Sequence, residues 1–303
     1  MMVNKCFKKG EVIFREGDFQ DTFYKVISGT VQIYLGYGSP EAKLITTLSA
    51  GEFFGEMGVI ETKSRSATVV AGDEEVVTEE YTSDDLNSFF QENPDQIMTI
   101  MEQIGARIGS LTKDYQDAMD AVQALEAGNV KQSGGILDKI LKAVGFYKSN
   151  RKLAEKMSAE EVIQPQRLPN DPSARLETFS KGTVICKEGS VMRCMYYLHA
   201  GEAGVYHGFG TPAEVRVATV YVDQMFGEMG LLTGAPRSAT VRAEKDNTLV
   251  EIILWDDLTD LFRTNPAKID SIIRYLSYRL RDLDRNYMKA CQKVYELSEA
   301  KKA

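Results

Sequence analysis

The chain has 303 residues, of which 43% are hydrophobic and 26% charged, a balance typical of globular domains that bury their own cores. Its formal net charge of −8 disfavours a nucleic-acid-binding surface as the main activity. No run approaches about 18 consecutive apolar residues, so we expect no membrane span, and the N-terminus lacks the apolar core of a signal peptide.

The residues that most often carry metal binding or catalysis are few and scattered. We expect the four cysteines to be reduced thiols in a cytoplasmic protein, because their spacing is not that of a metal site. The two histidines, His199 and His207, do not stand with a cysteine or carboxylate cluster, and we expect both to pack along strands. No catalytic set and no Walker loop is present, so the sequence predicts no metal and a protein that is not an enzyme.

In chain order, the first elements are short runs rich in β-branched and aromatic residues, bounded by glycine-containing turns. They predict strands at residues 12–14, 23–27, 31–35, 44–48 and 66–70. This spacing is typical of an antiparallel jelly-roll barrel. A short helix around Leu86 is expected next, and Pro94 then opens a longer helix with an apolar stripe from Ile97 to Ile108.

The same pattern returns later in the chain without a gap. Lys9-Gly10 recurs as Lys181-Gly182, Asn93-Pro94 as Asn265-Pro266, and Arg107 as Arg279. A period this long indicates two duplicated domains. We therefore predict an α+β, mainly β fold of two barrels, each followed by C-terminal helices, with domains at residues 1–127 and 176–303.

Residues 128–175 have no counterpart in the repeat and form a predicted helical linker. Glycines open it, prolines close it, and Ile136, Leu137, Ile140, Leu141 and Val144 form an amphipathic stripe between them. From residue 131 to 156 there are seven basic residues and two acidic ones. The segment is either a docking surface for an acidic partner or DNA, or a connector packed on the second barrel with a solvated basic face, and we favour the connector.

Two segments carry the chemistry. Phe54-Gly55-Glu56-Met57 is followed by Arg65-Ser66-Ala67, and the second copy has Phe226-Gly227-Glu228-Met229 and Arg237-Ser238-Ala239. In each copy the Arg stands nine residues after the Glu. Glycines before a short helix suit a phosphate, an arginine adds a bidentate contact to it, and a carboxylate accepts a hydrogen bond from a hydroxyl such as that of ribose. The two cassettes therefore each predict a site for one nucleotide.

The pattern resembles the phosphate-binding cassette of cyclic nucleotide-binding domains, found in kinase regulatory subunits, ion channels and catabolite activator-type regulators. The resemblance implies that Glu56 and Glu228 hold the ribose 2′-hydroxyl. It also implies that Arg65 and Arg237 pair with the cyclic phosphate, with Ser66 and Ser238 beside them. The sequence departs from the family pattern at Gly58 and Gly230, where many members have Ala, and at Ser64, where Pro is usual.

In the family, the long helix after the barrel often contributes a side chain that covers the base. Tyr115 and Tyr287 occupy equivalent places in the two copies. Each is a candidate base cap, and a surface or interface tyrosine is the alternative interpretation.

The cassettes favour a regulatory protein that binds cyclic nucleotide, cAMP in preference to cGMP, and signals to a protein effector by changing conformation. The alternatives are a transcription regulator that uses the basic linker for DNA, and a scaffold that binds no ligand. We do not expect a nucleic-acid or membrane partner. A homodimer through the long C-terminal helices is compatible with their apolar stripes.

Overall fold

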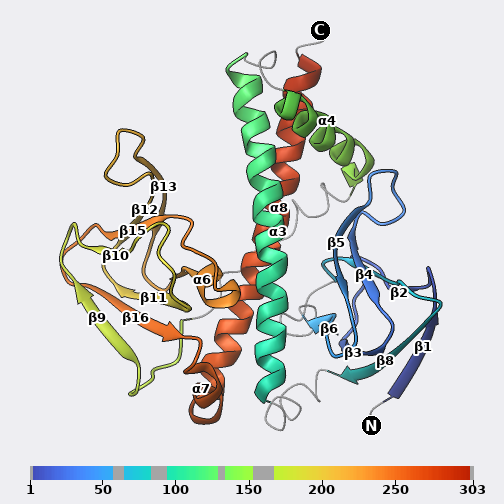
Figure 1. Cartoon of the computed structure of the whole chain (residues 1–303), viewed down its shortest axis with the longest axis horizontal. Helices are drawn as coiled ribbons and strands as arrows, with labels where there is room; N and C mark the ends of the chain where they lie inside the picture. Colours follow the sequence, from blue (N-terminus) through green and yellow to red (C-terminus); the bar gives the residue numbers. More distant parts are fainter. Residues whose placement is uncertain (1–2, 57–64, 83–93, 129–133, 153–166, 301–303) are drawn as a thin grey trace. The chain divides into compact units, whose positions relative to one another are not determined.

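The computed structural model describes residues 3–56, 65–82, 94–128, 134–152 and 167–300. The chain divides into two compact units. The first unit comprises Met1–Phe89, Arg107–Ile163 and Ser277–Ala303, and the second comprises Phe90–Ala106 and Gln164–Leu276. Each unit contains one β region of eight described strands, arranged as two four-stranded sheets (Figure 1).

The first β region begins at the N-terminus of the described chain. Its strands are β1 (Val3–Lys8), β2 (Val12–Phe14), β3 (Thr22–Ser28), β4 (Val31–Leu35), β5 (Lys43–Leu48), β6 (Phe53–Phe54), β7 (Thr68–Ala71) and β8 (Glu75–Thr82). One sheet has the order β1-β8-β3-β6 and the other β2-β7-β4-β5, with antiparallel pairing throughout.

Alternation of side chains along the strands builds the core between these sheets. In β4 the side chains of Val31, Ile33 and Leu35 are buried, while the two between them are half-buried. Phe54, at the end of β6, is fully buried in the same core and stacks on Tyr24 with ring centroids 5.1 Å apart. Because Phe54 is anchored in this way, the residues that follow it start from a fixed position.

The second β region repeats this arrangement. Its strands are β9 (Arg175–Phe179), β10 (Val184–Cys186), β11 (Cys194–Ala200), β12 (Ala203–His207), β13 (Val215–Val220), β14 (Met225–Phe226), β15 (Thr240–Ala243) and β16 (Thr248–Leu254). The sheet orders are β14-β11-β16-β9 and β10-β15-β12-β13. Phe226 stacks on Tyr196 at 5.0 Å, as Phe54 does on Tyr24.

The expected strands of the first copy are confirmed as β2, β3, β4, β5 and β7. The expected α+β fold with antiparallel sheets is confirmed in this form, whereas closure of the sheets into jelly-roll barrels stays a prediction. The prediction omitted β1, β6 and β8. β8 carries several Glu and Thr residues and is stabilised by pairing with β1, which is remote in sequence.

Two long helices follow the β regions, α3 (Pro94–Glu126) and α8 (Pro266–Ala300). Both begin at the expected proline after an asparagine, and each continues from the second unit into the first. The second unit also contains the short helices α6 (Glu228–Thr233) and α7 (Leu258–Thr264). No described helix is long and apolar enough to cross a membrane. The predicted helix around Leu86 lies outside the described residues, and the predicted domain boundaries stay a prediction.

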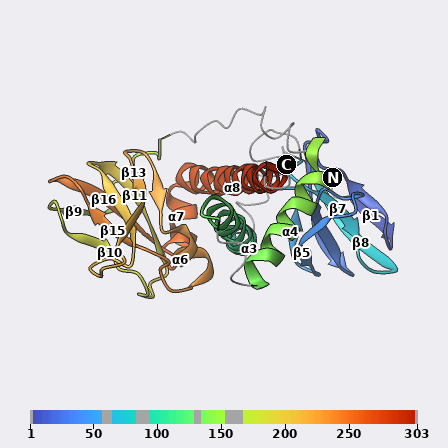
Figure 2. The ribbon, with the colours of Figure 1, turned by 90° about the horizontal axis from the view of Figure 1, so that it is seen from above.

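The linker contains α4 (Gly134–Ser149), which lies in the first unit beside β5 (Figure 2). Gly36 has no Cβ, and one placed there would stand 1.7 Å from Oδ1 of Asn150, so the glycine allows the end of the linker helix to approach. Phe146 also packs on Tyr287 of α8, with ring centroids 5.3 Å apart. The expectation that the linker packs on the second barrel is therefore wrong for α4.

The buried face of α4 also differs from the predicted stripe. Leu137 and Leu141 are 47% and 62% exposed, whereas Ile140, Phe146 and Tyr147 are buried. The aromatic side chains decide which face turns inward because they bury the larger area.

Part of the basic charge of the linker is used in ion pairs within the first unit. Lys139 lies 2.9 Å from a carboxylate oxygen of each of Asp117 and Asp120, and Lys148 lies 3.9 Å from Glu299. These pairs support the interpretation of the segment as a connector. Lys131 and Lys156 lie outside the described residues.

Candidate functional site

The arginine of the first cassette is attached to a turn in the loop between β2 and β3. The backbone N–H of Arg65 donates to the carbonyl of Asp18 at 2.8 Å, and the N–H of Gly17 donates to the carbonyl of Arg65 at 2.9 Å. Gly17 adopts a φ of 83°, which favours glycine. The Glu-Gly turn of the sequence therefore positions the cassette arginine.

The guanidinium of Arg65 points inward and is surrounded by protein acceptors. Nη1 donates to the carbonyl of Gly55 at 2.6 Å, and Nη2 donates to the carbonyl and the hydroxyl of Thr22 and to Gln20. The group lies 4.2 Å from the ring centroid of Phe14, a cation–π contact. Burial lowers the pKa of Arg65, against the opposing effect of Tyr24 and nearby carboxylates, but a guanidinium stays charged at neutral pH.

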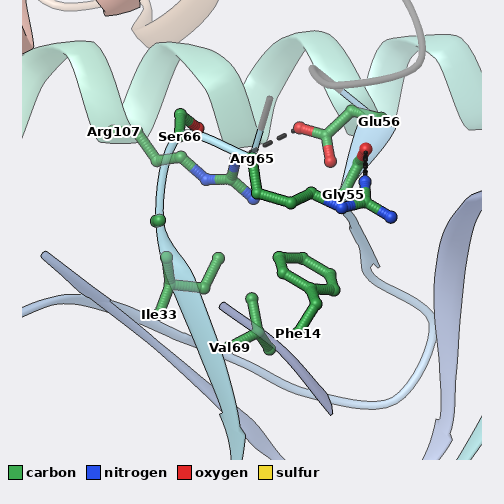
Figure 3. Close-up of a pocket in the computed structure, with 9 residues that line it drawn as sticks. Phe14, Ile33, Gly55, Glu56, Arg65, Ser66, Val69 and Arg107 are labelled. Atoms are coloured by element: carbon green, nitrogen blue, oxygen red, sulfur yellow. Dashed lines mark hydrogen bonds and ion pairs between the residues drawn. The ribbon is translucent and has the colours of Figure 1, made fainter. Parts of the chain in front are cut away.

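Glu56 is paired with an arginine of α3. Its Oε1 lies 3.1 Å from Nη1 of Arg107, and both side chains are buried, Glu56 at 1% exposed. Together with Arg65 they line a cavity of about 20 Å³, which has room for about one water molecule. Figure 3 shows Phe14 on the opposite side of this cavity from Glu56 and Arg107, so the site has one apolar and one charged wall.

The buried polar atoms at this site that have no hydrogen-bond partner among the described residues include Oε2 of Glu56, an acceptor, and Nε of Arg65, a donor. A buried polar group without a partner costs about 1–3 kcal/mol. The site can therefore gain from a ligand that supplies both a donor, such as a hydroxyl, and an anionic acceptor.

The second cassette has the same framework. The N–H of Arg237 donates to the carbonyl of Ser190 at 2.9 Å, and its Nη1 donates to the carbonyl of Gly227 at 2.6 Å. Nη2 donates to the carbonyl and to Sγ of Cys194, at 2.8 and 2.9 Å, where the first copy has Thr22. Nε of Arg237 is buried and, among the described residues, also has no partner.

The other described residues of the two cassettes differ in burial. Ser66 and Ala67 line the first cavity together with Gly55. In the second copy Gly227 caps α6 with a φ of 74°, Glu228 is buried, Met229 and Ala239 are half-buried, and Ser238 is exposed. Met57, Gly58 and Ser64 lie outside the described residues.

The two candidate base caps differ in environment. Tyr115 is half-buried on α3 and is not among the residues that line the first cavity. Tyr287 is 3% exposed and packs in the first unit against Phe146 and under the ammonium of Lys43, 4.4 Å from its ring centroid. Burial raises the pKa of Tyr287. Their role as base caps stays a prediction.

Arg107 is the site residue that the sequence reasoning missed. It follows Ile104 and precedes Ile108, so it is a charged residue inside an apolar helix stripe, and it recurs as Arg279. Its place in the apolar stripe and its recurrence could both have identified it as a candidate, because a charge on a buried helix face needs a partner. Which carboxylate it meets could not be read from the chain.

A buried carboxyl on α8 lies within electrostatic reach of the same arginine. Asp284 is 6% exposed, and burial raises its pKa to about 7, although Arg281, Lys43 and Arg107 oppose the shift. In the unfolded chain an aspartate titrates near about 3.9. Between these values the folded protein binds more protons than the unfolded chain, so this residue makes stability fall as pH rises from about 4 to 7.

Replacing Asp284 by Asn should remove that pH dependence. We expect Asp284→Asn to raise the free energy of unfolding by a few kcal/mol at pH 8, and the gain to shrink to nearly nothing by about pH 4. Urea denaturation of both proteins over this pH range measures the difference. A gain of the same size at every pH would show that the substitution acts by packing rather than by titration.

Among the described residues, no group of three or more His, Cys, Asp and Glu side chains could hold a metal ion. The sequence, however, matches a known family twice. The family model described as "Cyclic nucleotide-binding domain" matches residues 4–93 and 176–265, and each match contains one of the cassettes.

Similar curated proteins include protein kinases and their regulatory subunits. The chain is 26% identical over 246 residues to a cGMP-dependent protein kinase of Toxoplasma gondii, a match covering 81% of this chain and 19% of that protein. It is 23% identical to a cAMP-dependent protein kinase regulatory subunit of Blastocladiella emersonii (80% and 48% covered) and 24% identical to that of Dictyostelium discoideum (83% and 63% covered). The chain thus spans from a fifth to just under two thirds of the length of these relatives.

Solved structures similar to this chain include the regulatory domain of Toxoplasma gondii PKA with cAMP. That chain is 18% identical with a TM-score of 0.28, and the match covers 88% of this chain and 86% of that one. The regulatory subunit of a cAMP-independent protein kinase A from Trypanosoma brucei is 14% identical with a TM-score of 0.29, covering 87% and 78%. At such TM-scores the structural likeness adds nothing to the family match.

Proposed function

This chain belongs to the cyclic nucleotide-binding domain family, and we propose that it is a regulatory protein whose two cassettes each bind one cyclic nucleotide, cAMP in preference to cGMP. The observation that carries the proposal is the pair of partnerless buried atoms in the first cavity, Oε2 of Glu56 and Nε of Arg65. A nucleotide offers a ribose hydroxyl to the carboxylate and a phosphate oxygen to the guanidinium.

The two cassettes receive the same assignment of roles. Glu56 and Glu228 accept a hydrogen bond from the ribose 2′-hydroxyl, while Arg65 and Arg237 bind the cyclic phosphate with Ser66 and Ser238 beside them. The apolar wall of the first cavity, formed by Phe14, Ile33 and Val69, is suited to the flat face of a base.

Binding at the first cassette requires the site to rearrange. A cavity of about 20 Å³ is far smaller than the roughly 300 Å³ at the lower end of small-molecule sites. The ribose must share Glu56 with Arg107 or displace it, so nucleotide binding changes how α3 is held to the cassette. This supports signalling by population shift, in which the nucleotide favours the conformation that it binds better.

The effector of the protein is assigned from its relatives. Because the relatives include kinase regulatory subunits, we assign the chain a protein effector and a regulatory rather than enzymatic role. We keep the division into two nucleotide-binding domains joined by the basic helical linker, and the closed barrels expected for them. A dimer through the long helices remains compatible with this arrangement.

A calorimetric titration of the nucleotide-stripped protein with cAMP and then with cGMP tests the proposal. We expect two binding events per chain, of which Arg65→Ala removes one and Arg237→Ala the other. The nucleotide that binds more tightly identifies the ligand. Absence of heat, together with absence of thermal stabilisation at saturating nucleotide, would contradict the proposal and favour the scaffold.

The role of Glu56 has its own test. A hydrogen bond to a charged group contributes about 1.5–3 kcal/mol, so the wild-type first cassette should bind cAMP about tenfold or more tightly than its 2′-deoxy analogue. Glu56→Gln replaces the charged acceptor by a neutral one and should therefore discriminate less between the two nucleotides. The comparison is made in an Arg237→Ala chain, where only the first cassette binds nucleotide. Undiminished discrimination in Glu56→Gln would place the ribose elsewhere.

A further inference from the structure

Gly230 lies in α6, directly against the guanidinium of the cassette arginine. A Cβ built on Gly230 would stand 2.4 Å from Nη1, 2.7 Å from Cζ and 3.1 Å from Nε of Arg237, and these three atoms are its nearest neighbours. Real Cβ atoms essentially never show the first two of these distances, and the third is tighter than most real contacts. Arg237 can therefore adopt this inner placement only because residue 230 has no side chain.

The backbone gives no other reason for a glycine here. Gly227, at the cap of α6, has a φ of 74° and needs to be glycine, whereas Gly230 has a helical backbone that alanine adopts readily. The contact at Gly230 also involves the mobile end of a flexible side chain and not the main chain. An alanine would therefore displace Arg237 and leave the rest of the second β region in place.

The inner placement uses the groups of Arg237 that a phosphate would need. Nη1 is bonded to the carbonyl of Gly227, and Nη2 to the carbonyl and Sγ of Cys194. Bidentate recognition of a phosphate requires two parallel N–H groups of the fork. With both Nη groups held by the protein, a ligand has to compete with these internal acceptors.

We propose that Gly230 is a positioning residue that sets nucleotide affinity at the second cassette by permitting Arg237 to withdraw onto α6. This rests on the proposed function of the site. It reverses the usual expectation for a glycine in a phosphate-binding segment, because the space at Gly230 serves the arginine and not the ligand.

The sign of one substitution distinguishes the two roles. In an Arg65→Ala chain, where only the second cassette binds, Gly230→Ala excludes the inner placement. If that placement holds more than two thirds of the molecules, cAMP should bind at least about threefold more tightly. A glycine that makes room for the nucleotide would instead give weaker binding on substitution, and unchanged or weaker binding overturns the inference.

A double-substitution cycle shows whether the effect passes through Arg237. In an Arg65→Ala, Arg237→Lys background, a cation for the phosphate is kept but the guanidinium that the added Cβ displaces is absent, so Gly230→Ala should tighten binding less than it does beside Arg237. Tightening of the same size without Arg237 overturns the inference. Gly230→Ser adds a Cβ of the same position and should act in the same direction, which keeps the test valid if one variant folds poorly.

Gly135 supplies the matched control. It lies in α4, its added Cβ would meet no atom within 4 Å, and its substitution by alanine should leave affinity within about twofold. If the wild-type chain binds cAMP and Gly230→Ala does not tighten that binding, the inference is wrong and the proposed function is unaffected. If neither the wild-type chain nor any variant binds cAMP or cGMP, the proposed function is wrong, and so is the inference that rests on it.

Discussion

Replacing Arg237 by alanine is expected to weaken cyclic nucleotide binding at the second cassette by roughly 30-fold to several-thousand-fold. This corresponds to about 2–5 kcal/mol, the usual loss when one partner of a buried charge pair is truncated. Arg237 is 6% exposed and carries a buried Nε that has no partner among the described residues, so its truncation removes a donor that is available to a phosphate oxygen. Calorimetric titration in an Arg65→Ala background measures the loss.

Arg216 offers a control of the same residue type. It lies on β13, pairs with Glu202 at 3.3 Å on the surface, and is 41% exposed. Its replacement by alanine should leave nucleotide affinity within about threefold, because an exposed ion pair contributes only about 0–1 kcal/mol. If the nucleotide affinity of Arg237→Ala also stays within about threefold of that of the chain with Arg237, the phosphate role assigned to Arg237 is wrong.

Replacing Lys268 by methionine is expected to lower the free energy of unfolding of the second unit by about 3–5 kcal/mol. Lys268 is 1% exposed at the start of α8, and its ammonium bridges Asp171, at 2.7 Å, and Glu251. Methionine fills the same space without the charge. The two carboxylates would then lie close together with no cation between them, which is costly away from water.

The neighbouring groups are arranged around this ammonium. Glu251 uses its second oxygen for Nε2 of His199 at 2.9 Å. Burial tends to raise the pKa of Asp171, but its hydrogen bonds with Lys268 and Ser173 outweigh burial and leave that pKa below its ordinary value. The contribution of Asp171 to stability is therefore present above about pH 4 and lost as pH falls further.

Urea denaturation followed by tryptophan fluorescence measures the effect of Lys268→Met, because Trp255 is the single tryptophan and lies in the second unit. Lys245→Met is the control, since that lysine lies in the same unit, is 63% exposed in its pair with Glu202 at 3.3 Å, and should cost no more than about 1 kcal/mol. The triple variant Lys268→Met, Asp171→Asn, Glu251→Gln should recover part of the loss. Equal destabilisation by the two single variants would contradict the assignment of a buried network.

Much of the fold was predictable because its signals are local. The cassettes, the glycine turns and the Asn-Pro helix starts each depend on a few consecutive residues, so the repeat identified two domains and their family. β1 was missed because it is stabilised by pairing with β8, from Val3 opposite Glu80 to Lys8 opposite Glu75. The residues of β1 alone show no pattern that predicts this pairing.

The candidate site divides in the same way. Glu56 and Arg65 could be predicted as candidate nucleotide ligands because their spacing within one segment matches the family pattern. The contact between Arg107 and Glu56 could not be predicted, since 51 positions separate the two residues and only the packing of α3 brings their charges together. The buried face of α4 likewise depends on Phe146 meeting Tyr287, a contact between remote parts of the chain.

The sequence by itself determined the family, the two cassettes, most of the strands and the starts of the long helices, because short-range spacing and backbone preference specify these features. Only the tertiary structure decided how each cassette arginine is held, which carboxylate Arg107 pairs with, and that Gly230 lies under the guanidinium of Arg237. These contacts depend on side-chain placement across sheets and helices. The energy of a buried charge is set by whichever groups surround it in space, and the order of residues along the chain does not reveal them.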